Sequence, residues 1–380
     1  MWLKNFFNRK IFISYIIWRI LLFTVAALAP VFIANYGGRF PYYELLISSG
    51  LPYWVWSFAG FDGVHYLTIA ASGYSAQYTQ AFFPLYPLFI KLITINHVNL
   101  IAALLVSNFC FLISLYLLYL LFKLDYDSKT AFKAILLLLC FPTAFYFAAI
   151  YSESLFLLLT VASLLAVRKK HYLWAGLFAG FATATRIIGV FLLAVLIIEL
   201  YLDFKQRLII KAKLIEAFVG VVLAPLGLIA YMVYLKIQFD NPIYFLTAQP
   251  AFGAARSASA IISLPQVLFR YLKILTSVQL NTLPYFNAAL EFIMTIVPLA
   301  LLASYFRRMR FSYWIFSLGC LILPTFTGTL SSMPRYSLMT FLIFPLVVMS
   351  LGRNFKFIAL SLIILQVILL MMFSRGYWVA

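Results

Sequence analysis

Acidic side chains are scarce in this sequence, so each one that stands in a suitable pattern is a candidate for chemistry. Asp and Glu together number 10 in a chain of 380 residues. Asp62 and His65 stand three positions apart in Phe61-Asp62-Gly63-Val64-His65-Tyr66, and such a pair shares one face of a helical turn, with Cβ atoms about 5 to 6 Å apart. A carboxylate beside an imidazole can act as a general base with a partner that faces a phosphate. The alternative is that Asp62 caps a helix that begins near Gly63.

Glu153 is the second acidic candidate. It stands in Tyr151-Ser152-Glu153-Ser154, a polar cluster between two apolar stretches. A carboxylate at this place can meet a substrate at the membrane surface. The alternative, which the pattern favours, is a solvated turn in which Ser152 and Glu153 start the next helix.

Arginines in apolar surroundings are the natural partners for an anion. Arg186 interrupts a long apolar run, where a central Arg costs about 2.5 to 3.5 kcal/mol on insertion scales. Its planar donor fork can bind a phosphate. Arg335, in Met333-Pro334-Arg335-Tyr336, falls at a predicted helix end, and snorkelling to the interface is its alternative explanation. For Arg19, on the first span, a structural partnership with an acidic group is one interpretation, and the sequence does not decide it.

The sequence predicts no metal or cofactor site. Asp125-Tyr126-Asp127 has the form of a metal-binding pair for nucleotide sugars, but it lies on a basic loop, and we interpret it as solvated. The segments that we place outside contain no His and Glu with zinc spacing, no phosphate-binding Gly-rich loop and no Gly-flanked Ser. Cys110, Cys140 and Cys320 all lie in apolar stretches and are expected to be small core residues.

The elements that position these side chains must be membrane helices. Hydrophobic residues make up 65% of the chain and charged residues 10%, whereas soluble domains carry about 25% charged residues. The mean hydropathy is +1.03. The composition therefore predicts an all-α, polytopic transmembrane protein that forms a single integral membrane domain over 1–380. The net charge of +18 by itself suggests a nucleic-acid partner, but that interpretation is excluded once the basic residues are sorted by side of the membrane.

Hydropathy predicts eleven spans, each of which needs about 20 mostly apolar residues. The predicted spans are 11–35, 97–122, 134–150, 154–167, 172–185, 187–202, 214–237, 285–306, 314–330, 336–351 and 357–373. With the N-terminus in the cytoplasm, the inside segments are the N-terminus, 123–133, 168–171, 203–213, 307–313 and 352–356. These segments hold 18 of the 28 Lys and Arg residues, as the positive-inside rule requires. Asp62, Glu153, Arg186 and Arg335 then all face the outside.

Two long external segments, 36–96 and 238–284, are rich in aromatic residues, Pro and Gly, and we expect both to lie along the membrane surface. Within the first, 82–95 is predicted to be either a short interfacial helix or an additional partial span.

The candidate residues fall in motifs that resemble a known family. Phe61-Asp62-Gly63-Val64-His65-Tyr66-Leu67, followed by Ala81-Phe82-Phe83-Pro84-Leu85-Tyr86-Pro87, is similar to the second mannosyltransferase of GPI-anchor assembly and its prokaryotic relatives. Three further blocks agree in order along the chain. They are Phe141-Pro142-Thr143-Ala144 leading to Tyr151-Ser152-Glu153-Ser154, then 180–186 with Gly189, then Arg335-Tyr336. The family usually has Trp where this chain has Phe61.

The resemblance implies a GT-C glycosyltransferase fold, with 1–237 as the catalytic module, 238–284 as an external loop and 285–380 as C-terminal helices. It implies transfer of a sugar, expected to be mannose, with inversion from a polyprenyl-phosphate donor to a lipid-linked or glycan acceptor at the outer membrane face. No cofactor is implied. The membrane is expected to be that of a prokaryotic cell, or the endoplasmic reticulum if the protein is eukaryotic.

By position, the resemblance makes Asp62 the catalytic base. It makes the following residues candidates for substrate binding: His65, Tyr66, Glu153, Arg186, Arg335 and Tyr336. The competing class is a multispanning transporter or lipid flippase, which explains the spans and the buried Arg but not the clustering of motifs on one face.

Overall fold

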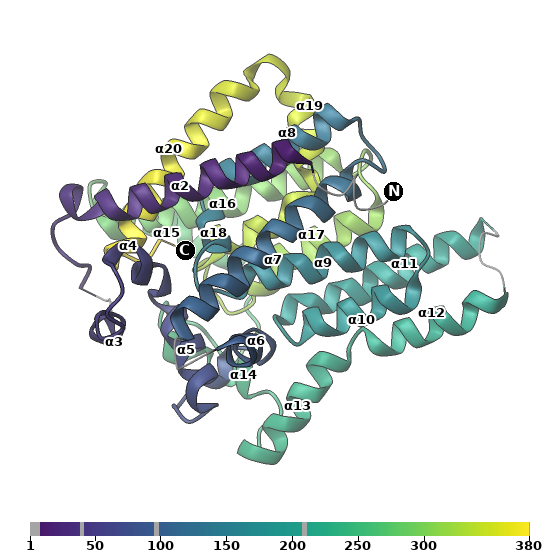
Figure 1. The fold of residues 1–380 in the computed structure, drawn as a ribbon, viewed down its shortest axis with the longest axis horizontal. Coiled ribbons are helices and arrows are strands. Elements are labelled where there is room, and N and C mark those ends of the chain that lie inside the picture. Colours follow the sequence, from purple (N-terminus) through teal and green to yellow (C-terminus); the bar gives the residue numbers. More distant parts are fainter. Residues whose placement is uncertain (1–7, 39–41, 95–98, 207–210, 380) are drawn as a thin grey trace. The chain divides into compact units, whose positions relative to one another are not determined.

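The computed structural model describes residues 8–38, 42–94, 99–206 and 211–379, and within these ranges it contains helices and no strand. The prediction of an all-α fold is confirmed (Figure 1). Among the described residues, six helical stretches are long and apolar enough to cross a membrane: Arg9–Phe32, Asn99–Phe122, Ile187–Lys205, Lys213–Phe239, Leu283–Tyr305 and Met333–Ser374. Two shorter apolar helices, Tyr172–Thr183 and Phe311–Thr325, accompany them. The chain is therefore a polytopic helical membrane protein. Lys4, Arg39 and Arg207, which enter the charge count above, lie outside the described residues.

The chain forms two compact units. Unit 1 consists of Met1–Ser75, Tyr86–Val161 and Phe344–Val379, and unit 2 of Ala76–Leu85 and Ala162–Ile343. The helices of unit 1 are α2 (Arg9–Phe32), α3 (Tyr43–Ile47), α4 (Tyr53–Trp56), α5 (Asp62–Ser72), α6 (Leu85–Ile93), α7 (Asn99–Phe122), α8 (Ser128–Cys140), α19 (Phe344–Leu351) and α20 (Phe355–Ser374). Helix α9 (Glu153–Arg168) belongs to both units. The division into modules expected from the sequence stays a prediction.

The helices of unit 2 are α10 (Tyr172–Thr183), α11 (Phe191–Lys205), α12 (Lys211–Leu223), α13 (Leu226–Phe239), α14 (Tyr244–Thr247), α15 (Leu264–Ser277), α16 (Leu283–Tyr305), α17 (Phe311–Thr325) and α18 (Met333–Tyr336). Short 3₁₀ helices complete the chain: Ser57–Ala59, Thr79–Ala81, Ala144–Phe147, Ile187–Val190, Gln249–Phe252, Ser337–Ile343 and Gly352–Asn354.

In unit 1, α2 packs along α20 and also contacts α8 (Figure 1). Buried side chains recur on α2 every three or four positions, the period of one helix face: Ile11, Tyr15, Trp18, Leu22, Val25 and Ala29. Gln366 of α20 joins these elements. Its Oε1 accepts a hydrogen bond from Trp18 Nε1 at 3.1 Å, and its Nε2 donates to the carbonyls of Leu139 at 3.1 Å and Phe141 at 2.6 Å. A buried amide with satisfied donors and acceptor therefore holds three segments together.

The expected span over 134–150 is wrong in its extent, because α8 ends at Cys140. Phe141 precedes Pro142, whose ring excludes helical geometry at the preceding residue. Phe141 accordingly has φ −61° and ψ 138°. A 3₁₀ turn and an irregular stretch follow as far as Glu153, and this places the Tyr151-Ser152-Glu153-Ser154 motif directly before and within the first turn of α9.

The end of α20 is tied to the segments that follow α2 and precede α5. Arg375 is buried, its guanidinium lies 3.8 Å from the centroid of the Tyr36 ring, and it donates to the carbonyl of Ala34. The hydroxyl of Tyr53 donates to the carbonyl of Ser374 at 2.8 Å. Ser374 and Arg375 are thus tied firmly into unit 1.

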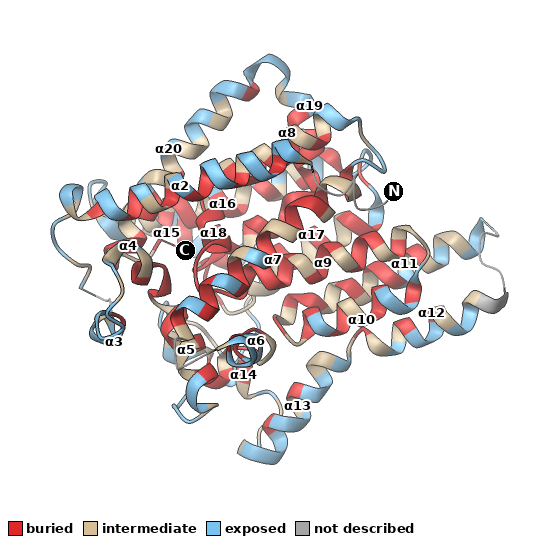
Figure 2. Cartoon of the chain, in the orientation of Figure 1, coloured by how far each residue is buried: buried red, intermediate tan, exposed pale blue. Residues whose placement is uncertain are grey.

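In unit 2, glycines allow α10 and α12 to approach closely. A Cβ built on Gly176 would lie 1.9 Å from the carbonyl oxygen of Gly220, and one built on Gly180 would lie 2.7 Å from that of Leu223. Small residues four positions apart are a common interface between membrane helices. The other face of α12 and α13 is exposed in Figure 2, with Ile215 and Phe218 at 74% and 71% exposure, as expected of side chains that meet lipid.

The predicted external segments contain short helices. Helix α6 has 9 residues, about half of the 20 or so needed to cross the hydrocarbon core. In the described part of the 82–95 segment, α6 is therefore too short to be a full span, and the choice between an interfacial helix and a partial span stays a prediction.

Candidate active site

Asp62 is the first residue of α5, and Phe61 occupies the N-cap position before it. Phe61 has φ +55° and ψ −114°, a conformation that residues with a side chain rarely adopt. Its ring packs against Trp378 at 5.1 Å and Phe373 at 5.7 Å between centroids. A strained residue that persists is held by its surroundings, and such residues cluster at functional sites. Here the strain lies directly before the candidate base.

The segment that carries Asp62 is joined by hydrogen bonds to the Tyr151-Ser152-Glu153-Ser154 motif. Tyr151 donates from its hydroxyl to the carbonyl of Gly60 at 3.0 Å, and the Ile150 amide donates to the carbonyl of Phe58 at 2.9 Å. Tyr66, predicted to bind substrate, donates from its hydroxyl to Ser152 Oγ at 3.0 Å. Two of the motifs found in the sequence therefore form one structural unit.

Glu153 does not lie in a solvated turn. Its exposure is 1%, at the start of α9, immediately after the Ser152 that Tyr66 contacts. A buried carboxylate needs hydrogen-bond or charge partners to offset its desolvation, so such a residue is retained for a structural or chemical purpose. The alternative interpretation of this motif is therefore wrong in its solvation, although Glu153 does start the next helix, α9.

His65 is half-buried, one turn after Asp62. Its ring meets that of Tyr42 edge-on, with the centroids 5.9 Å apart. Burial lowers the pKa of His65, and the nearby Asp62 carboxylate opposes this only in part. The imidazole is therefore neutral near pH 7, able to donate or accept a hydrogen bond but not to act as a fixed positive charge.

Unit 2 brings Arg186 together with Tyr336. Arg186 lies between the end of α10 and a short 3₁₀ helix, half-buried, with extended backbone angles of φ −155° and ψ 142°. Its guanidinium carbon lies 5.0 Å from the centroid of the Tyr336 ring. This cation–π contact joins the 180–186 block to the Arg335-Tyr336 block, which are far apart in the sequence.

Arg335 is buried in α18, and its Nη2 donates to Ser332 Oγ at 3.3 Å. The same oxygen accepts a hydrogen bond from Arg256 Nη2 at 3.2 Å. No motif in the sequence marks Arg256. The one local sign is Gly253 shortly before it, a residue that permits a left-handed turn.

The other charged residues singled out from the sequence have structural surroundings. Arg19 lies over the rings of Phe23 and Phe58, with its guanidinium carbon 3.8 and 4.5 Å from their centroids, so in the described chain aromatic rings take the place of an acidic partner. Asp127 caps α8 by accepting hydrogen bonds from the Lys129 and Thr130 amides at 2.8 and 3.0 Å. The interpretation of Asp125-Tyr126-Asp127 as an exposed loop is confirmed.

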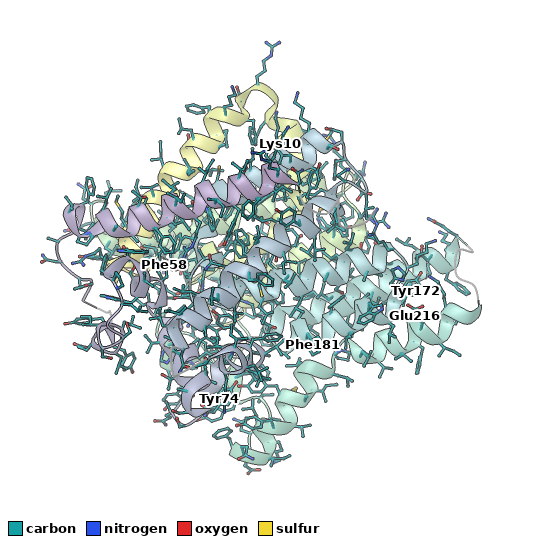
Figure 3. The ribbon with its side chains drawn as sticks, in the orientation of Figure 1. Lys10, Phe58, Tyr74, Tyr172, Phe181 and Glu216 are labelled. Carbon is teal, nitrogen blue, oxygen red and sulfur yellow. The ribbon has the colours of Figure 1, made fainter. Side chains whose placement is uncertain are left out.

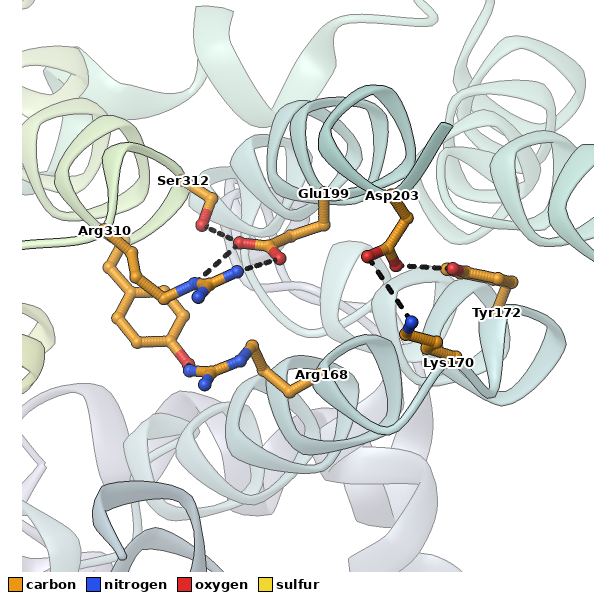
Figure 4. A network of polar contacts seen from close by, with 8 residues as sticks. Arg168, Lys170, Tyr172, Glu199, Asp203, Arg310 and Ser312 are labelled. Atoms are coloured by element: carbon orange, nitrogen blue, oxygen red, sulfur yellow. Dashed lines mark hydrogen bonds and ion pairs between the residues drawn. The ribbon is translucent and has the colours of Figure 1, made fainter. Parts of the chain in front are cut away.

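A separate polar network ties helix ends of unit 2 near the predicted cytoplasmic loops (Figure 4). Glu199 accepts hydrogen bonds from Arg310 Nε at 3.1 Å and Nη2 at 2.6 Å, and another from the Ser312 hydroxyl. Asp203 accepts one from the Tyr172 hydroxyl at 2.6 Å. These acidic residues are engaged by nearby donors and serve the packing of α10, α11 and α17.

At the same end of α10, the Leu173 amide donates to Glu216 of α12 at 3.3 Å, and Glu216 lies beside Tyr172 in Figure 3. Among the described residues, no group of three or more His, Cys, Asp or Glu side chains could hold a metal ion.

The fold is that of a polytopic helical membrane protein. In unit 1, the segment that carries Asp62 is hydrogen-bonded to the Tyr151-Ser152-Glu153-Ser154 motif. In unit 2, Arg186 contacts Tyr336, and Arg256 and Arg335 both donate to Ser332. A family model described as mannosyltransferase (PIG-V) matches residues 12–348. The match covers most of the chain, so the protein belongs to this mannosyltransferase family and is a membrane glycosyltransferase. The chain has no match among curated proteins.

Proposed function

We propose that the protein transfers a mannosyl group from a polyprenyl-phosphate donor to a lipid-linked or glycan acceptor at the external membrane face. The reaction is of the inverting GT-C type and uses no metal or cofactor. The observation that supports this most directly is the position of Asp62 at the start of α5, in a segment held by hydrogen bonds to the Tyr151-Ser152-Glu153-Ser154 motif.

Asp62 is the base in this proposal. An inverting transfer needs one group that takes the proton of the acceptor hydroxyl as its oxygen attacks C1 of the sugar. The half-buried Asp62 carboxylate fits this role. His65, neutral near pH 7, is suited to hydrogen-bonding a substrate hydroxyl or phosphate oxygen.

Arg186 and Arg335 bind the donor phosphate. Breakage of the bond between C1 and the phosphate oxygen leaves the electron pair on the phosphate, which must be stabilised by positive or hydrogen-bonding groups. A guanidinium group presents a planar fork that matches phosphate geometry. Tyr336 positions Arg186 through the contact of its ring, while Tyr66 and Glu153 help to shape the acceptor side.

The test is a transfer assay. Purified protein in lipid nanodiscs is incubated with radiolabelled polyprenyl-phosphate mannose and a lipid extract, with heat-inactivated protein as the control. We expect label to move into a lipid or glycan product in a time-dependent manner. If label moves only when a nucleotide sugar replaces the lipid donor, the proposed donor is wrong.

A further inference from the structure

Three successive residues before Arg256 lie in the left-handed region of backbone conformation. They are Gly253 with φ +77°, Ala254 with φ +58° and Ala255 with φ +50°. Glycine adopts such angles freely, but alanine does so at a cost. Strain of this kind persists only where the surroundings fix it. The contacts that hold this turn, and the position that it gives to Arg256, therefore bear on function.

Backbone hydrogen bonds hold this turn against the loop that precedes α18. The Ser257 amide donates to the carbonyl of Thr327 at 2.8 Å, and the Ile262 amide donates to that of Phe326 at 3.0 Å. Arg270 Nη1 of α15 donates to the carbonyl of Gly328 at 3.2 Å. Two segments of unit 2 that are distant in sequence are thus fixed side by side.

A buried network supports the loop from its other side. The Tyr271 hydroxyl is hydrogen-bonded to the carboxylate of Glu291, accepts from the Leu330 amide at 3.1 Å and lies 3.1 Å from Thr329 Oγ1. The Ser331 amide also donates to Thr329 Oγ1 at 3.1 Å. The carboxylate of Glu291 therefore takes part in holding the loop through Tyr271.

The result is that two guanidinium groups meet at one neutral oxygen. Arg256 Nη2 and Arg335 Nη2 lie 3.2 and 3.3 Å from Ser332 Oγ, so the two nitrogens are no further apart than the sum of these distances. Like charges at this separation repel, most strongly when they are partly removed from water. The carboxylate of Glu291 interacts with Arg256 and offsets part of this charge, but the geometry in which both forks converge on Ser332 remains. Arg335 is buried and Arg256 half-buried. An anion that accepts from both forks removes this repulsion.

We propose that Arg256 and Arg335 form a two-guanidinium site for the phosphate of the polyprenyl-phosphate donor, with Ser332 holding both forks in place. The identity of the ligand rests on the proposed function. In the transfer, the bond from C1 to the phosphate oxygen breaks and the acceptor oxygen bonds to C1. The acceptor proton passes to Asp62. The donor phosphate, a diester with one negative charge, leaves as a monoester that carries a second.

The second charge appears during the chemical step, so Arg256 stabilises the transition state and the product more than the bound donor. The expected signature is kinetic. Loss of Arg256 lowers kcat more than it raises KM for the donor, and it weakens binding of the monoester product.

The test compares Arg256→Gln and Arg256→Lys with Lys273→Gln, which removes a charge from an exposed position on α15. Transfer kinetics are measured with each substrate varied, together with inhibition by a polyprenyl monophosphate. For Arg256→Gln we expect kcat to fall about 10²-fold and the inhibition constant to rise about tenfold or more, with KM for the acceptor unchanged. Arg256→Lys, which keeps the charge but not the fork, should fall between Arg256→Gln and wild type, and Lys273→Gln should match wild type.

Two results overturn the inference. One is equal kinetics and inhibition for Arg256→Gln and Lys273→Gln. The other is a change confined to KM for the acceptor, which assigns the two arginines to an acceptor phosphate. If the wild-type protein transfers no sugar, the proposed function is wrong, but this result does not test the phosphate site. The site is then tested by the binding of polyprenyl monophosphate, measured by thermal shift. Weaker binding by Arg256→Gln, or by Arg256→Lys if the first variant does not fold, supports the site, and unchanged binding rejects it.

Discussion

At the scale of single residues, the two units hold different kinds of chemistry. Unit 1 carries the carboxylates of Asp62 and Glu153, one half-buried and one fully buried. Unit 2 carries the guanidinium groups of Arg186, Arg256 and Arg335. In a glycosyl transfer from a lipid phosphate, proton removal and charge stabilisation are separate tasks, so substitutions in the two sets test different parts of the proposed mechanism.

Arg186 allows charge and geometry to be separated. Arg186→Lys keeps the positive charge but loses the planar fork and the contact of that fork with the Tyr336 ring. We expect kcat/KM for transfer to fall about 10²-fold, measured on protein that elutes as a single species at the wild-type level. Arg353→Lys, the same substitution at an exposed site, is the control. Wild-type turnover by Arg186→Lys would end the role of Arg186 as a phosphate-binding fork.

The sequence predicts which residues are polar in apolar surroundings, but not how deeply they are buried. The local pattern around Glu153 favours a solvated turn, because the segment that packs against its neighbour Ser152 comes from another motif, where the Tyr66 hydroxyl donates to Ser152. No local motif marks Arg256, because it is linked to Arg335 through Ser332, which lies 76 residues after Arg256 in the chain. Contacts of this kind arise from packing, and no local pattern encodes them.

At the scale of elements, the C-terminal end of α20 bears on the candidate base. Trp378 packs against the strained Phe61, and it lies outside the residues 12–348 that the family model matches. Trp378→Ala should release Phe61 and let Asp62 shift. We expect kcat to fall about 10²-fold, the scale of a 1 Å misplacement, with KM little changed.

Trp378→Phe keeps a ring against Phe61 and should retain most of the activity. For both variants, kcat and KM are compared with the temperature of thermal unfolding. A Trp378→Ala protein with lowered stability but wild-type kcat would show that Trp378 contributes only to packing.

Hydropathy predicts the long helices well, because α7 and α16 lie within or close to the expected 97–122 and 285–306. It fails at 134–150, where every residue is apolar enough but Pro142 ends the helix early. It also leaves 82–95 undecided, and only the observed length of α6 shows that the helix is too short to span.

At the scale of the whole molecule, the predicted orientation rests on the distribution of Lys and Arg. Single cysteines introduced at the exposed positions Lys129 and Ser259 should differ in labelling by a membrane-impermeant maleimide in intact cells. We expect labelling at Ser259 and none at Lys129 until the cells are permeabilised. The native protein, in which Cys110 and Cys320 are buried, gives the background. Labelling of both positions in intact cells would contradict the topology.

The proposed sugar transfer depends most on Asp62 as its base. Asp62→Asn keeps the size of the side chain and a hydrogen-bonding oxygen in the first turn of α5, but it cannot take the proton of the acceptor. Glu44→Gln, at an exposed carboxylate of α3, is the matched control. The decisive measurement is kcat for transfer of labelled mannose by folded Asp62→Asn. We predict a loss of about 10² or more with Glu44→Gln unaffected, and near-normal transfer by Asp62→Asn would contradict the account.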